Sequence, residues 1–323
     1  MKFLDVKERE GQYDATVAET AEPLPGPGEV LFQVAASGIN RADLAQIAGR
    51  YPPPPGEPSI LGLEISGTLE NGDAVCALVA GGAHAERAAV PARQIFPAPR
   101  CLDLVSAAGI PEAFLTAYLN LVAEAGLRAG ETLLVHAGAS GVGLAAVALG
   151  KFLGARVAAT TRTKEKLSAL IAGGADLAVD TSSNDLVVEV EREWGAGSVD
   201  VILDPVGAKT LEADVRLLAT GGRVVFIATL SGASAPLDLG ALMGKRARLI
   251  GSMLRARPRE EKAALVDRFQ RDILPGFDAG RLSVTVDSIY PPARAAEAFT
   301  RMRQNRNTGK ILIDWTRSDP VPA

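Results

Sequence analysis

The feature that most constrains the fold of this chain is the alternation of short apolar runs with longer helical segments after Pro111. Such alternation is typical of βαβ units, in which helical crossovers join parallel strands. We expect strands over residues 132–136, 156–160, 177–180, 199–204, 223–228 and 248–253. Helices are expected over residues 142–152, 164–172, 185–194 and 209–219. The pattern predicts an α/β chain that contains a doubly wound parallel sheet of the Rossmann type.

Residues 30–100 have a different texture, rich in Gly and Pro, with short apolar runs between turn signals. This texture predicts a β-rich lobe. After Glu260 we expect a helix, a strand near Val284, a helix over residues 293–303 and a final strand over residues 310–314 that return to this lobe. A chain of 323 residues is long enough for two domains. The expected domains are residues 1–117 with 258–323, and residues 118–257.

Charge and composition exclude several classes of partner. The formal net charge is −4, with acidic and basic residues interspersed, so we expect no nucleic acid and no membrane partner. The unbroken apolar runs are far below the roughly 20 residues of a membrane span, and the N-terminus lacks a signal pattern, so we expect a cytoplasmic protein. Cys76 and Cys101 are too few for a disulfide framework or a four-thiolate zinc site, and we expect reduced, structural thiols.

A glycine-rich turn follows the first strand of the predicted parallel sheet and leads into a long helix. Glycines there let the backbone turn tightly and approach a pyrophosphate, which the N–H groups at the helix start would hold. Ser140 stands where the second glycine of G-x-G-x-x-G would be, and a residue of this size still admits the pyrophosphate. A purely structural turn is the alternative. The predicted dinucleotide-binding residues are Gly138, Ser140, Gly141, Val142 and Gly143.

The segment after the second strand indicates which nicotinamide cofactor binds. NAD-specific sites place an acid at this strand end, about 20 residues after the glycines, to bind the ribose 2′-hydroxyl. Here the strand end carries Thr161 and no acid, and Arg162 and Lys166 are spaced to share one face of a helix starting at Thr163. Two cations suit a 2′-phosphate, so we predict NADPH bound by these residues. The alternative is that both are ordinary solvated charges.

Three further segments carry a resemblance to a known family: Ala35-Ala-Ser-Gly-Ile-Asn-Arg-Ala-Asp-Leu44, Leu61-Gly-Leu-Glu-Ile-Ser-Gly67 and Ile110-Pro-Glu-Ala-Phe-Leu-Thr-Ala-Tyr118. With the glycine-rich turn, they resemble the zinc-independent quinone oxidoreductase branch, or zeta-crystallin-like proteins, of the medium-chain dehydrogenase/reductase superfamily. The similarity extends through residues 251–257 to 307–311. It implies a GroES-like catalytic domain of residues 1–117 and 258–323, a Rossmann NADPH-binding domain of residues 118–257, and a site in the cleft between them.

The zinc ligands of related enzymes are missing from this sequence. Zinc-containing relatives bind the metal through a cysteine in the first of these segments and a histidine in the second. Asn40 and Leu63 hold those positions here, and only Glu64 remains of the ligand set. Leu cannot coordinate zinc and Asn is a poor ligand, so we expect no metal. The connecting loop Thr68–Asp73 is shorter than in most of the branch and is expected to reshape one side of the cleft.

Without a metal, the hydride acceptor must be polarised by hydrogen bonds or be electrophilic already, as quinones are. The resemblance places Asn40, Asp43 and Tyr51 in the nicotinamide and acceptor pocket, beside Arg50. Asn40 would orient the acceptor or the cofactor amide, Asp43 would fix neighbouring donors, and Tyr51 would donate to the developing oxyanion or enolate. Alternatively, Asn40 and Asp43 cap a helix that begins near Arg41, and both roles can coexist.

The resemblance implies further cofactor contacts at the junction of the domains and in a C-terminal segment. Thr181 replaces a tyrosine that lies near the adenosine phosphate in several relatives. His84 and His136 are expected to be structural, and no Ser-His-Asp arrangement or metal cluster is expected from two histidines so far apart. The cofactor contacts implied by the resemblance are Asn40, Thr116, Tyr118, Asn305 and Lys310.

These observations predict a zinc-free oxidoreductase that transfers hydride from NADPH to a small quinone. An enoyl or enal reductase of the same superfamily is the nearest alternative, and a weakly active NADPH-binding sensor or structural protein is a third. The last strand of the parallel sheet, expected over residues 248–253, leaves an apolar edge that could pair with its copy. We therefore expect a homodimer.

Overall fold

The computed structural model describes residues 1–317 and divides the chain into two compact units. Unit 1 contains Met1–Leu115 and the segment from Arg255 onward, and unit 2 contains Thr116–Leu254. The boundaries expected from the sequence, 117/118 and 257/258, lie close to these divisions. The assignment of catalysis to one unit and of cofactor binding to the other stays a prediction.

Within the described residues, unit 2 contains a six-stranded parallel sheet whose order is β10-β9-β8-β11-β12-β13. In chain order this is 3-2-1-4-5-6, the order of dinucleotide-binding sheets, so the predicted Rossmann fold is confirmed. The strands are β8 (Thr132–Val135), β9 (Arg156–Thr161), β10 (Leu177–Asp180), β11 (Val199–Asp204), β12 (Leu218–Phe226) and β13 (Arg248–Gly251).

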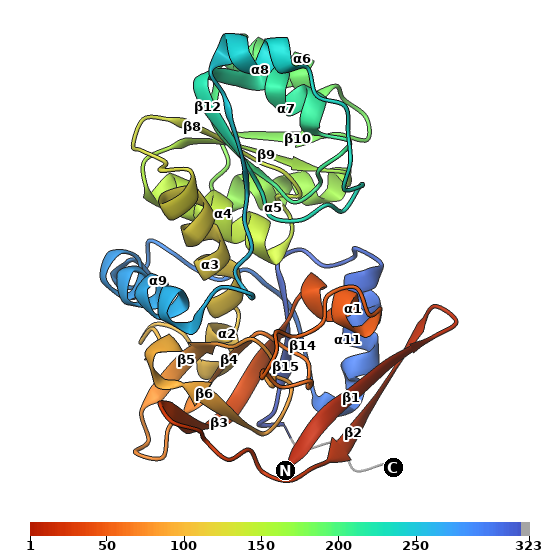
Figure 1. Ribbon diagram of the computed structural model, residues 1–323, viewed down its shortest axis with the longest axis vertical. Coiled ribbons are helices and arrows are strands. Elements are labelled where there is room, and N and C mark those ends of the chain that lie inside the picture. The colour runs from red at the N-terminus through yellow and green to blue at the C-terminus, as the bar shows by residue number, and fades with distance from the viewer. Residues whose placement is uncertain (318–323) are drawn as a thin grey trace. The chain divides into compact units, whose positions relative to one another are not determined.

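Helices cover both faces of this sheet, with α4 and α5 on one face and α6 and α7 on the other (Figure 1). Apolar side chains of α6 pack into the core at Leu186, Val187 and Val190, while Asp185 caps its first turn by accepting from two backbone N–H groups. The helical segments of unit 2 are η2 (Leu119–Glu124), α4 (Gly141–Phe152), η3 (Lys164–Lys166), α5 (Leu167–Ala172), α6 (Leu186–Trp194), α7 (Leu211–Leu217) and α8 (Leu239–Lys245).

Three elements of unit 2 differ from expectation. The helix expected over residues 209–219 ends at Leu217, because Leu218 already belongs to β12 and pairs with Val199 of β11. Helix α8 was not expected, since the segment before it is rich in turn-forming residues. The helix expected from Thr163 starts as a 3₁₀ turn, in which the N–H of Lys166 donates to the Thr163 carbonyl at 3.0 Å.

Unit 1 contains a seven-stranded sheet in its described part, ordered β14-β15-β3-β4-β5-β7, with β6 also paired to β3. The C-terminal strand β15 pairs with β3, so this lobe is discontinuous in sequence. Residues 68–73 form a tight turn between β4 and β5, closed by the N–H of Leu69 to the Asp73 carbonyl at 3.1 Å. The strands are β3 (Glu29–Ile39), β4 (Glu64–Thr68), β5 (Ala74–Leu78), β6 (Arg87–Pro91), β7 (Ile95–Pro97), β14 (Val286–Tyr290) and β15 (Lys310–Asp314).

A separate hairpin, β1 (Lys2–Arg9) with β2 (Gln12–Glu19), packs on α11 (Ala295–Arg303). Leu4 and Phe299 belong to the apolar cluster at this contact, where the rings of Tyr13 and Phe299 lie 5.8 Å apart. The remaining helical segments are α1 (Arg41–Ile47), η1 (Ala92–Gln94), α2 (Leu104–Ala107), α3 (Pro111–Tyr118), α9 (Arg259–Asp272), α10 (Leu274–Asp278) and η4 (Pro292–Arg294).

One helical stretch, Leu104–Glu124, is long and apolar enough to cross a membrane by length and composition. It was not expected from the sequence, because polar residues interrupt its apolar runs. Of its most apolar window, 78% is buried inside the protein. Helices that form the core of a globular protein have the same composition, so this stretch is weak evidence for a span.

Candidate functional site

The ammonium group of Lys310 is the centre of a buried polar network in unit 1. Its Nζ donates to Asn40 Oδ1 at 2.8 Å, to the Ile39 carbonyl at 3.2 Å and to Glu64 Oε1 in a short contact. The side chains of Lys310 and Glu64 are 4% and 0% exposed. Charges buried to this extent require a partner, and this pair supplies one for each. The contact of Lys310 with a cofactor, expected from the resemblance, would require one of these bonds to break.

Glu64 receives hydrogen bonds on both carboxylate oxygens. Oε1 also accepts from Asn40 Nδ2 at 2.9 Å, and Oε2 accepts from the backbone N–H of Glu112 at 2.9 Å. The Glu112 carboxyl lies close by, and burial, followed by the charge of Glu64, raises its pKa to about 8. Glu112 therefore holds a proton at neutral pH while Glu64 pairs with Lys310. Glu112 was not among the predicted residues. An acid inside the apolar run 110–115 could have indicated a buried functional carboxyl.

Asn40 and Asp43 lie at the start of α1, as the capping interpretation predicted. Asp43 Oδ2 accepts from the backbone N–H of Asn40 at 2.7 Å, and Asp43 Oδ1 accepts from the Gly62 N–H at 3.0 Å. The Asn40 Nδ2 donates to the Gly38 carbonyl at 3.1 Å as well as to Glu64. Both of its donors are therefore used. Asn40 can only accept a further hydrogen bond through Oδ1, which suits a cofactor amide better than an oxyanion.

Ser37, His84 and Asp43 lie next to one another in that order, which corrects the expectation that no such arrangement forms. His84 Nδ1 lies 2.8 Å from Ser37 Oγ, and His84 Nε2 lies 3.6 Å from Asp43 Oδ2. The three residues come together because β3, α1 and the loop before β6 meet in the fold. Ser37 is 0% exposed and also accepts from Trp315 Nε1 at 3.2 Å. The arrangement is enclosed, so it supports the fold and offers no nucleophile to a substrate.

Tyr51 is half-buried, and its hydroxyl has no hydrogen-bond partner among residues 1–317. Burial, followed by the charge of Glu112, raises its pKa, so the phenol remains protonated at neutral pH. A protonated hydroxyl without a partner can donate to an acceptor.

Asn305, expected to contact the cofactor, lies just after α11, with a backbone φ of 55°. Its Oδ1 accepts a short hydrogen bond from the Arg41 guanidinium.

In unit 2 the glycines of the predicted loop permit a tight turn between β8 and α4. A Cβ added at Gly143 would lie 2.5 Å from the Ala137 carbonyl oxygen, and one at Gly138 would lie 2.9 Å from the Ala159 Cβ. Backbone and side chains of the unit itself therefore fill the space. Ser140 is the N-cap of α4, and its Oγ accepts from the Gly143 N–H at 3.0 Å. The substitution of glycine by serine at this position thus supplies a cap.

The N-terminus of α4 fits a pyrophosphate. Amides of the first helical turn have no acceptor within the helix, and only that of Gly143 is bonded to Ser140. The N–H groups of Gly141 and Val142 are left without an acceptor in the described part of the chain. The Gly138 N–H donates to the Thr160 carbonyl at 2.7 Å, which joins the loop to β9. The fold therefore brings residues 138–143 beside the end of β9, where the second set of predicted residues begins.

Arg162 is exposed immediately after β9, and Lys166 is half-buried at the end of the 3₁₀ turn. The two residues do not share one face of an α-helix, because Arg162 precedes the turn and the turn is not α-helical. The pair nevertheless flanks one short turn next to Thr161. Thr161 Oγ1 accepts from the Thr163 N–H at 3.2 Å, which orients the backbone at the strand end.

Asp180, the last residue of β10, lies opposite Thr161 at this strand end. Its oxygens accept from the Ser182 N–H at 3.0 Å, the Ser182 hydroxyl at 2.7 Å and the Ser183 hydroxyl at 2.9 Å. The bonds from Ser182 are the main reason that the pKa of Asp180 is lowered. Asp180 is therefore occupied by its own turn, which agrees with a site that does not use an acid for the ribose hydroxyl.

The remaining predicted residues of unit 2 are enclosed or already bonded. Thr116 and Tyr118 of α3 are 9% and 1% exposed. The Thr181 hydroxyl donates to the Thr161 carbonyl at 3.2 Å. His136 Nε2 lies 2.7 Å from Asp214 Oδ1 in the core, so its position is explained by this buried pair.

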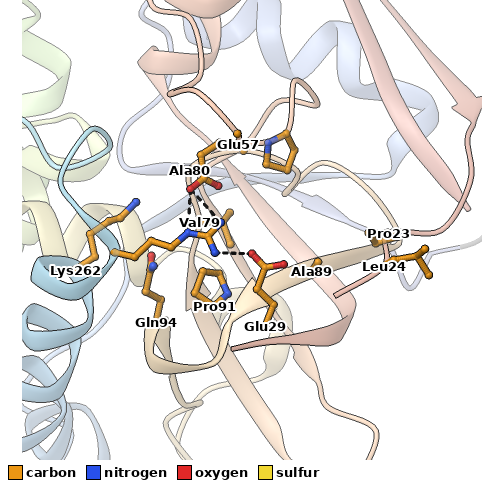
Figure 2. A pocket seen from close by; sticks show the side chains of 14 residues that line it. Pro23, Leu24, Glu29, Glu57, Val79, Ala80, Ala89, Pro91, Gln94 and Lys262 are labelled. Atoms are coloured by element: carbon orange, nitrogen blue, oxygen red, sulfur yellow. Dashed lines mark hydrogen bonds and ion pairs between the residues drawn. The ribbon is translucent and has the colours of Figure 1, made fainter. Parts of the chain in front are cut away.

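A cavity of about 200 Å³ lies elsewhere in unit 1, and Figure 2 shows Glu29 and Glu57 on one side of it and Lys262 and Gln94 on the other. Arg259, which also lines it, donates to Glu29 at 2.7 Å and to Glu57 at 3.3 Å. The two carboxylates balance the two cations, so no unpaired charge marks a ligand there. None of the residues predicted from the sequence lines this cavity.

The donors around Asn40 do not fit a metal ion. The place between Asn40 and Glu64 is filled by the Lys310 ammonium, and Leu63, which lies next to Glu64, is buried and apolar. Within residues 1–317, no group of three or more His, Cys, Asp or Glu side chains could hold a metal.

Comparison with known proteins agrees with this architecture. Residues 26–100 match the alcohol dehydrogenase GroES-like domain family, and residues 141–271 match the zinc-binding dehydrogenase family. The quinone oxidoreductase of Thermus thermophilus, described with its NADPH complex, is 34% identical, with a TM-score of 0.82 over 97% of this chain and 100% of that chain. The chain belongs to the quinone oxidoreductase branch of the medium-chain dehydrogenase/reductase superfamily. The predicted family is confirmed.

Curated relatives span a wider range of proteins. The human quinone oxidoreductase is 27% identical over 92% of both chains. A segment of the spectinabilin polyketide synthase system protein NorB of Streptomyces orinoci is 36% identical over 93% of this chain. This chain spans only 14% of that longer protein. These relatives support an oxidoreductase activity, and they do not identify the hydride acceptor.

Proposed function

We propose that this protein is an NADPH-dependent reductase that transfers hydride to a small quinone without a bound metal. The observation that carries the proposal is the Lys310 ammonium between Asn40 and Glu64. A cation held there by three acceptors leaves no room for a Lewis acid, so the hydride acceptor must be polarised by hydrogen bonds or be electrophilic on its own. Quinones meet this requirement.

Residues of unit 2 would hold the cofactor. The free amides of Gly141 and Val142 would bind the pyrophosphate, and Arg162 with Lys166 would bind the 2′-phosphate. Bound NADPH would supply the hydride. The similarity to the Thermus thermophilus enzyme, described with NADPH, supports this assignment.

Residues of unit 1 would serve the acceptor. The unpartnered Tyr51 hydroxyl would donate to the oxygen on which charge develops. Asn40 would accept a hydrogen bond through Oδ1 from the cofactor amide. Hydride addition to a quinone gives a delocalised hydroquinone anion, and one proton from solvent or Tyr51 completes the reduction.

The decisive experiment is a panel assay of the purified protein with NADPH against small quinones, enals and enoyl thioesters. We expect the highest kcat/KM for a quinone, and we expect Tyr51→Phe to lower quinone turnover only modestly. Losing a positioned donor costs on the order of 10² to 10³ in rate where a basic enolate forms. A wild-type preference for enals, with activity abolished in Tyr51→Phe while NADPH still binds, would replace quinone by enal in this proposal.

An enoyl or enal reductase is therefore the second candidate function. The similarity to a segment of a polyketide synthase protein is the observation that favours it. The same panel assay distinguishes the two functions. A protein that binds NADPH and reduces none of the three acceptor classes would instead match the third alternative, a sensor or structural role.

Cofactor preference is tested separately, by titrating NADPH and NADH into the wild type and into the Arg162→Ala/Lys166→Ala double variant. We expect the wild type to bind NADPH more tightly, and the double variant to lose most of that preference. The matched control is Arg192→Ala, an exposed arginine of α6 that pairs with Glu189. Equal affinities in the wild type would remove NADPH from the proposal.

We also propose that the protein forms a homodimer through β13. This strand is one of the two edges of the sheet. Leu239 and Met243 of the preceding helix α8, and Met253 just after the strand, are more than half exposed. An open strand edge beside exposed apolar side chains favours pairing with a second copy. Light scattering at working concentration should give twice the chain mass, and a monomer mass would contradict the proposal.

A further inference from the structure

The guanidinium group of Arg255 is buried and holds three separate segments of unit 1. Arg255 is 4% exposed and begins the segment that returns from unit 2. Its Nε donates to the Ala80 carbonyl at 2.8 Å, its Nη1 to the Tyr51 carbonyl at 3.1 Å, and its Nη2 to Gln46 Oε1 at 2.6 Å. Burying a charge costs free energy unless hydrogen bonds satisfy it, and these three acceptors do so.

The same group also contacts the ring of Tyr51. The guanidinium carbon lies 5.2 Å from the ring centroid, within the range of a cation–π interaction. One side chain therefore restrains both the backbone and the ring of the residue that we propose as the donor.

The loop that carries Tyr51 makes few backbone hydrogen bonds of its own, among them that from the Glu57 N–H to the Pro54 carbonyl at 3.1 Å. Residues 52–55 are prolines, which lack the backbone N–H that would bond the loop internally. Gln46, held by Arg255, donates through Nε2 to the Ser59 carbonyl at 2.9 Å. Arg255 thus restrains the loop directly at Tyr51, and through Gln46 near its other end.

We propose that Arg255 is a positioning residue for Tyr51, fixing its backbone and ring so that the hydroxyl remains oriented to donate to the acceptor. The proposal rests on the function proposed above for Tyr51. The planar fork of arginine is needed because three acceptors from three segments lie around it, whereas the ammonium of lysine is a compact point charge. The charge of Arg255 also opposes the rise in the Tyr51 pKa, which favours proton donation.

The test is a double-mutant cycle with Arg255→Met and Tyr51→Phe, assayed with an enal and with a quinone. We expect Arg255→Met to lower kcat for the enal by about tenfold or more, since a misplaced group loses its catalytic contribution, with a smaller effect on the quinone. In the Tyr51→Phe background Arg255→Met should cause no further loss. An equal loss in both backgrounds, or for both acceptors, would overturn the proposal.

Two variants provide controls. Arg301→Met removes another arginine of unit 1, one that pairs with Asp287 on β14 and not with the loop that carries Tyr51, and it should leave the ratio of enal to quinone turnover unchanged. Arg255→Lys retains the charge over the ring and should recover part of the activity lost in Arg255→Met. If Arg255→Met does not fold, Arg255→Lys is used in the same cycle.

A measurement without substrate separates this proposal from the proposed function. Ultraviolet titration of the phenols, with Tyr51→Phe to identify the signal, should show a higher pKa for Tyr51 in Arg255→Met than in the wild type, because a neighbouring cation is lost. If the wild type reduces neither acceptor, the proposed function fails and this titration decides alone. An unchanged Tyr51 titration would overturn the positioning role.

Discussion

The predicted cofactor loop of unit 2 and the buried polar network of unit 1 are built in different ways. The loop consists of residues 138–143 joined to the end of the next strand, so its parts are close in sequence. The network joins Asn40, Glu64 and Lys310, and Lys310 lies 246 residues from Glu64. A local motif can be recognised in a sequence, whereas a network of distant residues exists only after the strands have paired.

The two regions also differ in what stabilises them. Backbone turns and one helix cap hold the residues of the loop, and each contributes little to the free energy of unfolding. The network contains a buried ion pair, Lys310 with Glu64, and the neutral side chain of Asn40, which hydrogen-bonds to both. Single substitutions should therefore affect stability strongly in the network and more moderately in the loop.

The largest effect is expected from Lys310→Met. The substitution leaves the Glu64 carboxylate buried without its cation, which typically costs about 3–5 kcal/mol of unfolding free energy. Urea unfolding of the whole protein measures it. The Lys310→Met/Glu64→Gln double variant should recover more than half of the loss, because no buried charge remains. A single-variant loss below about 1 kcal/mol would show that the network is not stabilised by this pair.

Gly143→Ala should have the next largest effect. The added Cβ would lie 2.5 Å from the Ala137 carbonyl oxygen and 2.6 Å from that of Gly138, so the turn must shift. We expect a loss of about 2 kcal/mol and weaker NADPH binding, as for other overpacked sites. Gly244→Ala in α8 is the control, since its Cβ would meet nothing within 4 Å. If both variants are equally stable, the tight-turn explanation is wrong.

Glu112→Gln tests the network through pH. Because folding raises the pKa of Glu112 from 4.5 to about 8, the protonated form is favoured in the folded state, and its contribution to stability is lost as pH rises through this range. Glutamine cannot ionise, so the free energy of unfolding of the variant should exceed that of the wild type by about 2 kcal/mol at high pH and by little at pH near 4. The figure of about 2 kcal/mol is smaller than the full pKa shift implies, because the Glu112 side chain is partly exposed.

Thermal unfolding of both proteins at low and high pH measures this difference. Glu70→Gln, an exposed acid in the turn between β4 and β5, is the matched control and should give no such crossover. A difference between Glu112→Gln and the wild type that is the same at both pH values would contradict the buried, protonated carboxyl.

Ser140→Ala should have the smallest effect. It removes the hydroxyl that accepts from the Gly143 N–H, and loss of such a cap costs about 1 kcal/mol. Ser140→Asp retains a capping oxygen and should keep the stability, yet its charge should repel a pyrophosphate and weaken NADPH binding. Isothermal titration with NADPH separates the two variants. Unchanged binding in Ser140→Asp would place the pyrophosphate away from this helix start.

Several features of the fold and the candidate site could be predicted from the sequence. The strands of unit 2 and the start of α1 at Arg41 follow local patterns, namely apolar runs and a pair of capping residues. The sequence predicted wrongly that Arg162 and Lys166 share one face of an α-helix, because a 3₁₀ turn and an α-helix begin with similar residues. Glu112 was overlooked because its pKa depends on burial and on Glu64, which is distant in sequence.

What the sequence by itself determined is the parallel strands of unit 2, the glycine turn, the family and the absence of zinc ligands at positions 40 and 63. These depend on residue type and short spacing, which local steric and apolar preferences translate directly into structure. Only the tertiary structure decided that Lys310 pairs with Glu64, that Ser37, His84 and Asp43 adjoin, and that Arg255 holds Tyr51. Such contacts form when strand pairing closes long loops, and burial then turns the resulting proximity into strong electrostatic interactions.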